Sequence, residues 1–217
     1  MINDNKEFLQ SKLTASEVSE KDWKKIRNDL HFIERMTKLA KEKGCRLIVS
    51  GGYAVDGSLG RITRPHGDID IQIYGQDNGE RLVNDFIAGV KESESTFSEV
   101  ELKDKGRQQY YNVFFAEGNG LGSDIYYIQV TENPFGTEKH VVKKDGSHTE
   151  RQTYDTVQVI LEGVKFEAIN PTSELIDKLY KRKIRGDVPK MKHDQDVENL
   201  KLITDNNVVK ARLAEMR

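Results

Sequence analysis

Hydrophobic residues first recur every three or four positions along this chain and later every second position. The first pattern predicts a long amphipathic helix, or two shorter ones, ending at Gly44. Its apolar positions are Trp23, Ile26, Leu30, Ile33, Met36 and Leu39. Residues 68–74 alternate strictly and predict a strand with one buried face. Between these segments we expect a short apolar strand at residues 46–50, a break at Gly51-Gly52 and a short helix at residues 53–59.

The remaining pattern predicts more strands and then only helices. Strands are expected at residues 110–116, 124–130, 153–161 and 164–169, and helices at residues 80–90, 173–185, 192–203 and 207–216. We therefore expect an α+β fold, a mixed β-sheet flanked by helices with a C-terminal helical segment. The expected division is a main domain of residues 1–169, with an N-terminal helical extension, and a C-terminal helical region of residues 170–217.

Composition narrows the class of protein. The chain has 217 residues, 36% of them hydrophobic and 32% charged, which fits a folded protein with a real core. Cys45 is its only cysteine, so no disulfide or cysteine-based zinc site forms within it. No stretch is apolar enough for a membrane span or a signal peptide, and we expect a cytoplasmic protein. The formal net charge of −2 argues against nucleic acid as a partner.

The alternating strand carries the first chemical signal, the pair Asp68 and Asp70. Alternate residues share a face, so these carboxylates lie about 6–7 Å apart on the face opposite the isoleucines. They repel each other unless a cation lies between them. Magnesium ions favour carboxylate and phosphate oxygens together, and paired metal ions serve in phosphoryl and nucleotidyl transfer. The alternative is a solvated pair of surface carboxylates.

The segment before this strand strengthens the chemical interpretation. Gly51 and Gly52 follow an apolar strand and precede a short helix, so backbone and helix N–H groups can approach a phosphate. SGGYAVDGSLGRITRPHGDIDI, residues 50–71, resembles the signature of antibiotic nucleotidyltransferases of the DNA polymerase β-like superfamily. It is most similar to the aminoglycoside 2″-nucleotidyltransferase type, with the lincosamide type next. The matching residues are Gly51, Gly52, Ala54, Asp56, Gly60, Arg61, Thr63, Arg64, His66, Asp68 and Asp70, while Tyr53 replaces a frequent tryptophan.

The resemblance implies a nucleotidyltransferase fold and roles for particular residues. Asp68 and Asp70 would hold Mg²⁺ together with a third carboxylate that also acts as general base. Asp124, at the start of a predicted strand, is the expected third carboxylate, and Glu101 and Glu117 are the alternatives.

The expected nucleotide-binding residues are Gly51, Gly52, Arg61, Arg64, Lys178 and Lys192. Other interpretations stay open: either arginine could clamp a nearby carboxylate such as Asp56, and either lysine could lie on a solvated helix face. His66 could orient Asp68 or simply pack in the core.

The expected reaction is adenylyl transfer. A hydroxyl of a small molecule, an aminoglycoside in the first instance, would attack the α-phosphorus of ATP or another nucleoside triphosphate and release pyrophosphate. A polycationic acceptor requires acidic residues, and the acidic residues considered are Asp177, Asp187, Asp194 and Asp196. Tyrosines that alternate along two predicted strands, Tyr110, Tyr111, Tyr126 and Tyr127, offer rings for stacking. The alternatives are a lincosamide, tRNA or protein acceptor, or a silent nucleotide-binding protein, and we expect a monomer or homodimer.

Overall fold

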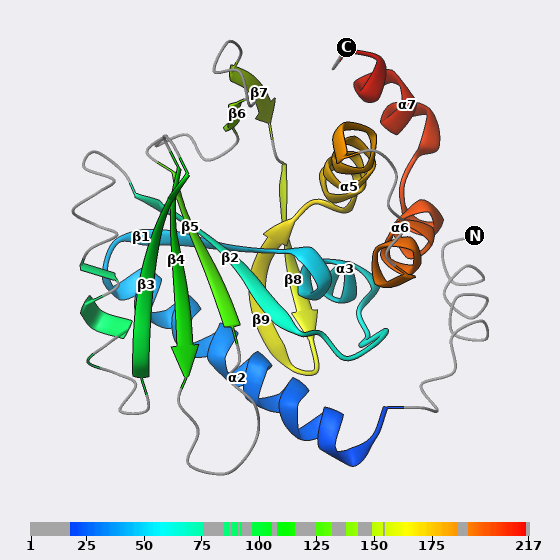
Figure 1. The fold of residues 1–217 in the computed structure, drawn as a ribbon. Helices are drawn as coiled ribbons and strands as arrows, with labels where there is room; N and C mark the ends of the chain where they lie inside the picture. The colour runs from blue at the N-terminus through cyan, green and yellow to red at the C-terminus, as the bar shows by residue number, and fades with distance from the viewer. Residues whose placement is uncertain are drawn as a thin grey trace.

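One mixed β-sheet with helices around it forms the body of the protein (Figure 1). This computed structural model describes residues 18–75, 85–86, 88–90, 92, 97–105, 108–115, 125–131, 138–142, 149–153, 155–185 and 191–215. The labelled helices are α2 (Glu20–Glu42), α3 (Gly51–Leu59), α5 (Pro171–Arg185), α6 (Met191–Ile203) and α7 (Asn206–Glu215). The strands are β1 (Cys45–Ser50), β2 (Asp68–Gly75), β3 (Phe97–Lys105), β4 (Gln108–Phe115), β5 (Ile125–Thr131), β6 (Glu138–Val142), β7 (Thr149–Thr153), β8 (Thr156–Leu161) and β9 (Val164–Ile169).

The strand order explains how distant segments meet. The seven-stranded sheet runs β3-β4-β5-β2-β1-β9-β8, and β6 pairs with β7 separately. β2 lies antiparallel to β1 and parallel to β5, while β1 lies parallel to β9. The sheet is therefore mixed, and the predicted α+β class with a C-terminal helical segment is confirmed. β2, which carries Asp68 and Asp70, occupies the centre of the sheet.

Most predicted elements are present, with three strands added and one helix start corrected. The expectation that Gly51-Gly52 separates strand from helix was wrong, because α3 begins at Gly51 itself. β3 was not predicted, because its charged residues lower strand propensity, although an edge strand tolerates them. β6 and β7 were also missed, because their sequences lack an alternating apolar pattern. In residues 80–90, the described positions are helical.

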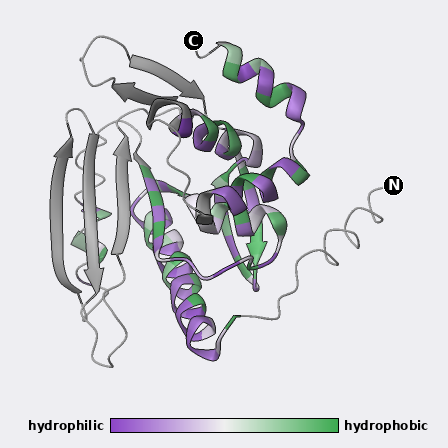
Figure 2. Ribbon diagram, turned by 45° about the vertical axis from the view of Figure 1, so that its right-hand side comes forward, coloured by the Kyte–Doolittle hydropathy of each residue, from purple (hydrophilic) through white to green (hydrophobic). Residues whose placement is uncertain are grey.

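The main core lies between α2 and one face of the sheet, and each contributes the apolar face that its own periodicity predicted. Ser19 caps the start of α2 by accepting a hydrogen bond from the backbone N–H of Asp22, and Lys43 caps its end, just before Gly44. Its buried apolar residues are Ile26, Leu30, Phe32, Ile33, Met36 and Ala40, and Figure 2 shows both hydrophobic and hydrophilic residues along this helix. In β2, Ile69, Ile71 and Ile73 are fully buried. None of the described helices is long and apolar enough to cross a membrane.

A second apolar cluster joins α3 to the C-terminal helices. Its buried members are Val55, Leu175, Val197, Leu200 and Val209. Val55 belongs to α3, whereas the other four belong to α5, α6 and α7. The division at residue 170 stays a prediction, but the helices beyond it pack directly against the element that follows β1 (Figure 1).

Candidate functional site

The centre of the candidate site is the junction between β1 and α3, where the backbone meets Asp70. Ser50, the last residue of β1, pairs with Asp70 of β2. Gly51 has a φ of +68°, and a Cβ atom built on it would lie 2.1 Å from Oδ2 of Asp70. A side chain here would displace the carboxylate, and the positive φ also favours glycine. Gly51 therefore lets the start of α3 lie directly against Asp70.

Gly52 makes the same kind of close approach to a second motif residue. A Cβ atom on Gly52 would lie 2.1 Å from Nδ1 of His66. The predicted contact of the two glycines with phosphates stays a prediction, and what the structure shows is their role in packing. Each glycine lacks the side chain that would collide with a later residue of the motif, Asp70 for Gly51 and His66 for Gly52.

The start of α3 has the properties of an anion site. Its N-cap residue, Ser50, is extended and makes no side-chain capping hydrogen bond. The first N–H groups of a helix lack partners within the helix, and the helix dipole makes this end positive. Beside it lie Asp68 and Asp70, which are partly exposed on the polar face of β2. Helix N–H groups suit phosphate oxygens, and adjacent carboxylates suit a divalent cation.

Asp68 and Asp70 fit a magnesium site as a donor set, because both supply hard oxygen ligands at a partly open position. Within the described ranges, no group of three or more histidine, cysteine, aspartate or glutamate side chains gathers at one point. Asp124 and Glu117, two of the residues considered as third carboxylate, lie outside the described residues. Ile125, which follows Asp124 in the chain, pairs with Asp68.

The register separates the third alternative, Glu101, from this centre. A row of paired residues crosses the sheet through Ser50, Asp70, Tyr127, Asn112 and Glu101. Strands β5 and β4 therefore lie between Asp70 and Glu101, and three strand spacings amount to roughly 14 Å. This distance argues against Glu101 as a ligand shared with Asp70. The same row makes Tyr127 the neighbour of Asp70 in register.

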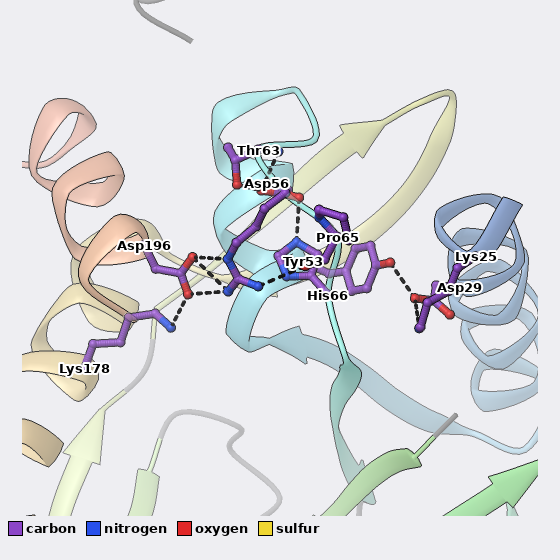
Figure 3. A network of polar contacts seen from close by, with 10 residues as sticks. Lys25, Asp29, Tyr53, Asp56, Thr63, Pro65, His66, Lys178 and Asp196 are labelled. Carbon is purple, nitrogen blue, oxygen red and sulfur yellow. Dashed lines mark hydrogen bonds and ion pairs between the residues drawn. The ribbon is translucent and has the colours of Figure 1, made fainter. Parts of the chain in front are cut away.

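A buried carboxylate, Asp56, holds the loop between α3 and β2. Its Oδ1 accepts hydrogen bonds from the backbone N–H of Thr63 at 3.2 Å and from Thr63 Oγ1 at 2.6 Å. Nε2 of His66 donates to Oδ2 of Asp56 at 2.7 Å, and both side chains are buried (Figure 3). The suggestion that His66 orients Asp68 was therefore wrong, because its Nε2 binds Asp56. The loop that leads into β2 is fixed to α3 at two points.

Tyr53, which replaces the tryptophan frequent in the motif, connects this loop region to α2. Its ring lies 4.5 Å from the imidazole of His66, centroid to centroid. Its hydroxyl donates a hydrogen bond of 2.6 Å to Oδ2 of the fully buried Asp29, and Lys25 lies 2.7 Å from the same oxygen (Figure 3). A tryptophan would lack this oxygen atom. Sequence analysis did not identify Asp29, because the helix was predicted from the spacing of its apolar residues alone. Asp29 lies on the same buried face as those residues.

The second motif arginine, Arg64, pairs with a carboxylate of the C-terminal region. Its Nε and Nη2 atoms donate to both oxygens of Asp196 at 2.9–3.2 Å. Lys178 of α5 lies 3.1 Å from Oδ2 of Asp196 (Figure 3). Burial would raise the pKa of Asp196, but the charges of Lys178 and Arg64 and their hydrogen bonds hold it below its ordinary value. Arg64 thus clamps a carboxylate, but the carboxylate is Asp196, 132 positions away, where a nearby one such as Asp56 was expected.

The other predicted residues lie around this arrangement. Arg61 is partly buried, and its backbone N–H donates to the carbonyl of Asp56 at 3.1 Å. Lys192 lies in the first turn of α6. Among the acidic residues considered for the acceptor, Asp194 pairs with Arg182, Asp177 is buried in α5, and Asp187 lies outside the described residues. Asp196 is committed to two cations, so it does not serve as a free acidic group for an acceptor.

Comparison with known proteins agrees with the motif. Residues 32–156, more than half of the chain, match the family described as aminoglycoside-2″-adenylyltransferase. Curated relatives named 2″-aminoglycoside nucleotidyltransferase, from Escherichia coli and Klebsiella pneumoniae, are 42% identical over 49 residues. This segment is 23% of the chain and spans 28% of each relative, so it covers less than a third of their length.

Solved structures show the same fold over most of the chain. The solution structure of the antibiotic-resistance factor ANT(2″)-Ia matches with a TM-score of 0.59 and 14% identity, covering 88% of this chain and 92% of that one. Its crystal structure in complex with adenylyl-2″-tobramycin matches with a TM-score of 0.59 and 17% identity, over 87% and 96%. An antigenic nucleotidyltransferase-like protein from Paracoccidioides brasiliensis matches with a TM-score of 0.53 and 10% identity, over 86% of each chain.

The structural matches confirm the nucleotidyltransferase fold that the motif implied. The family match confirms the resemblance to the aminoglycoside 2″-nucleotidyltransferase type. The family match includes α3, β2 and the motif between them, where the geometry described above is concentrated. On this basis, the chain belongs to the aminoglycoside-2″-adenylyltransferase family.

Proposed function

We propose that this protein transfers AMP from ATP to the 2″-hydroxyl of an aminoglycoside and releases pyrophosphate. The observation that carries this proposal is the contact between Gly51 and Asp70, which puts the start of a helix beside a carboxylate pair. The N–H groups at the start of the helix suit phosphate oxygens, and the carboxylate pair suits the cation that accompanies the phosphates. The family description supplies the acceptor class and the hydroxyl.

The residues of the chain have distinct roles in this reaction. The first N–H groups of α3 would bind phosphate oxygens, and Asp68 with Asp70 would hold Mg²⁺. Mg²⁺, when bound, would neutralise charge on the triphosphate and stabilise the leaving pyrophosphate. Asp124, directly before β5, would accept the proton of the attacking hydroxyl. Its position next to Ile125, the register partner of Asp68, supports this assignment.

Cationic residues would complete the nucleotide site. Arg61 and Arg64 follow α3 within the motif, while Lys178 and Lys192 belong to α5 and α6. Lys178 already lies with Arg64 on the same carboxylate, which brings a motif cation and a C-terminal cation together. Tyr127, the register neighbour of Asp70, is our proposed aromatic contact for the acceptor.

A mass-spectrometric transfer assay tests the proposal. Protein, Mg²⁺ and each of the four nucleoside triphosphates would be incubated with tobramycin, other aminoglycosides that have a free 2″-hydroxyl, and lincosamides. The variants Asp68→Asn, Asp70→Asn and Asp124→Asn would run beside Asp155→Asn, a control that changes an exposed aspartate before β8. We expect an AMP mass gain on an aminoglycoside, lost on addition of EDTA and in the first three variants only.

Other results would change the conclusion in defined ways. Modification of a lincosamide alone would keep the reaction and replace the acceptor. Binding of ATP that requires Asp70 and Mg²⁺, without modification of any drug, would keep the nucleotide site and direct the search to tRNA and protein acceptors. Failure to bind any nucleotide would contradict the proposal as a whole.

A further inference from the structure

Arg64, Asp196 and Lys178 form a contact between the motif loop and the C-terminal helices, and we call these three residues the hub. Arg64 belongs to the loop that connects α3 to β2, Lys178 to α5 and Asp196 to α6. The family match ends at residue 156, so two of the three hub residues lie beyond it. The contact between these three residues therefore does not follow from the family match.

The hub is largely buried, and Glu174 adds a second carboxylate beside it. The side chains of Asp196, Lys178 and Arg64 are 1%, 10% and 16% exposed. Lys178 also lies 3.4 Å from Glu174, whose side chain is 5% exposed. Arg64 and Lys178 thus lie beside two carboxylates, in a region that solvent reaches only in part. Removing one carboxylate from such a group leaves an uncompensated buried charge, which is far more costly than losing a surface ion pair.

Arg64 also connects the hub to the chain that leads to Asp68. Its Nε and Nη2 atoms donate to Asp196, and Nη1 donates to the backbone carbonyl of Pro65 at 3.2 Å. Pro65 is followed by His66, which is fixed to Asp56, and then by Gly67 and Asp68. A planar guanidinium held at both oxygens of a carboxylate has one orientation. Asp196 therefore fixes the orientation of the Arg64 guanidinium, whose Nη1 atom donates to the carbonyl of Pro65.

We propose that Asp196 is a positioning residue of the nucleotide site. Asp196 holds Arg64 and Lys178 together, and in this way α5 and α6 contribute to that site. The inference rests on the proposed function and deepens it. Asp196 itself does not touch nucleotide or acceptor. It acts through the orientation of the two cations and through the loop that precedes Asp68.

Binding of the Mg²⁺ complex of α,β-methylene-ATP, measured by calorimetry, tests this role without relying on turnover. Asp196→Asn removes the charge and keeps the shape, so we expect affinity to fall about ten- to hundredfold. Asp196→Glu keeps the charge and should recover most of the affinity. Glu198→Gln is the matched control, because Glu198 lies exposed on the same helix and pairs with Lys201, away from the hub. It should bind like the wild type.

Arg64→Lys provides a second route if Asp196→Asn fails to fold. It keeps the cation but loses the paired donation to Asp196, so it should weaken binding as Asp196→Asn does. The double variant should be no weaker than the worse single variant, because both changes break the same pair. In the transfer assay, KM for ATP should rise more than kcat falls in variants that circular dichroism shows to be folded.

The outcomes separate the two proposals. If the wild type binds the nucleotide and folded Asp196→Asn binds it equally well, Asp196 has no positioning role. If Arg64→Lys weakens binding while Asp196→Asn does not, Arg64 contacts phosphate independently of Asp196, and the inference is overturned. If the wild type binds no nucleotide, the proposed function fails first.

Discussion

The carboxylate of Asp70 fills the space that a side chain on Gly51 would occupy, with 2.1 Å between Oδ2 and the position of a Cβ atom. Gly51→Ala must therefore move Asp70 as well as strain the backbone at a φ of +68°. We expect kcat/KM for adenylyl transfer to fall about 100-fold or more, since a shift of one ångström in a catalytic group has that effect.

Gly60→Ala is the matched control for this prediction. Gly60 has a φ of +70°, but a Cβ atom there meets nothing within 4 Å. It should cost about 1 kcal/mol of unfolding free energy, from backbone strain alone, and leave kcat/KM nearly unchanged. Equal losses of activity in the two variants would show that strain, and not the contact with Asp70, is responsible.

Replacing Asp56 should destabilise the motif loop strongly. Asp56→Ala leaves the backbone N–H and hydroxyl of Thr63 and the imidazole of His66 without their acceptor. We expect a loss of about 3 kcal/mol in the free energy of unfolding, measured with urea. Thr63→Val removes only the hydroxyl donor and should cost about 1 kcal/mol. Similar losses in both variants would mean that His66 and the Thr63 N–H find other partners.

The sequence predicted the parts of the site that depend on local pattern. Alternation predicted that Asp68 and Asp70 share a face opposite Ile69 and Ile71, because a strand repeats every two residues. The motif identified Gly51, Gly52 and His66, but not that each glycine makes room for a later residue of the same motif. Contacts of that kind depend on how β1 and β2 pair.

Long-range partners lay beyond sequence reasoning. Asp196 was considered as an acid for the acceptor, since an aspartate in a polar helix gives no sign of a buried arginine partner. The pairing depends on the packing of α6 against α3, which arises from the apolar cluster around Val55 and Val197. Asp29 is a similar case, because its partner Tyr53 lies on another helix.

The charged environment of Asp196 makes stability depend on pH in a defined direction. Its pKa in the folded protein lies below the ordinary value of 3.8. In the interval below that value the unfolded chain binds a proton that the folded chain does not, so the free energy of unfolding decreases as pH falls. The contribution is fully present above about pH 5 and is lost as pH passes through the folded pKa.

Urea unfolding of the wild type and Asp196→Asn between pH 3 and pH 7 checks this dependence. The difference between the two proteins should stay constant above about pH 5 and shrink below about pH 4. Glu167, whose pKa is also lowered by hydrogen bonds from Arg46 and Thr156 despite its burial, is present in both proteins and cancels. A difference that stays constant down to pH 3 would contradict the prediction.

The packing of α3 on the hairpin of β8 and β9 should tolerate no added methyl group. A Cβ atom on Gly57 would lie 2.7 Å from Cγ2 of Val159 and 3.1 Å from Cζ of Phe166. Gly57→Ala should therefore cost about 1–3 kcal/mol of unfolding free energy, despite the higher helix propensity of alanine. Adding Val159→Ala should recover part of that loss. Stabilisation by Gly57→Ala alone would show that the hairpin yields easily.

The pairing of Arg64 with Asp196 joins residues 132 positions apart, and β1 takes β9 as its neighbour from a segment more than a hundred residues later. During synthesis, the motif loop and the strand that carries Asp68 and Asp70 leave the ribosome long before these partners exist. One edge of β1 stays open until residues 164–169 have emerged, and Arg64 has no carboxylate to bind until α6 follows. The segment from β1 to the motif loop is thus synthesised early, but it completes its contacts only after β9 and α6 have been made.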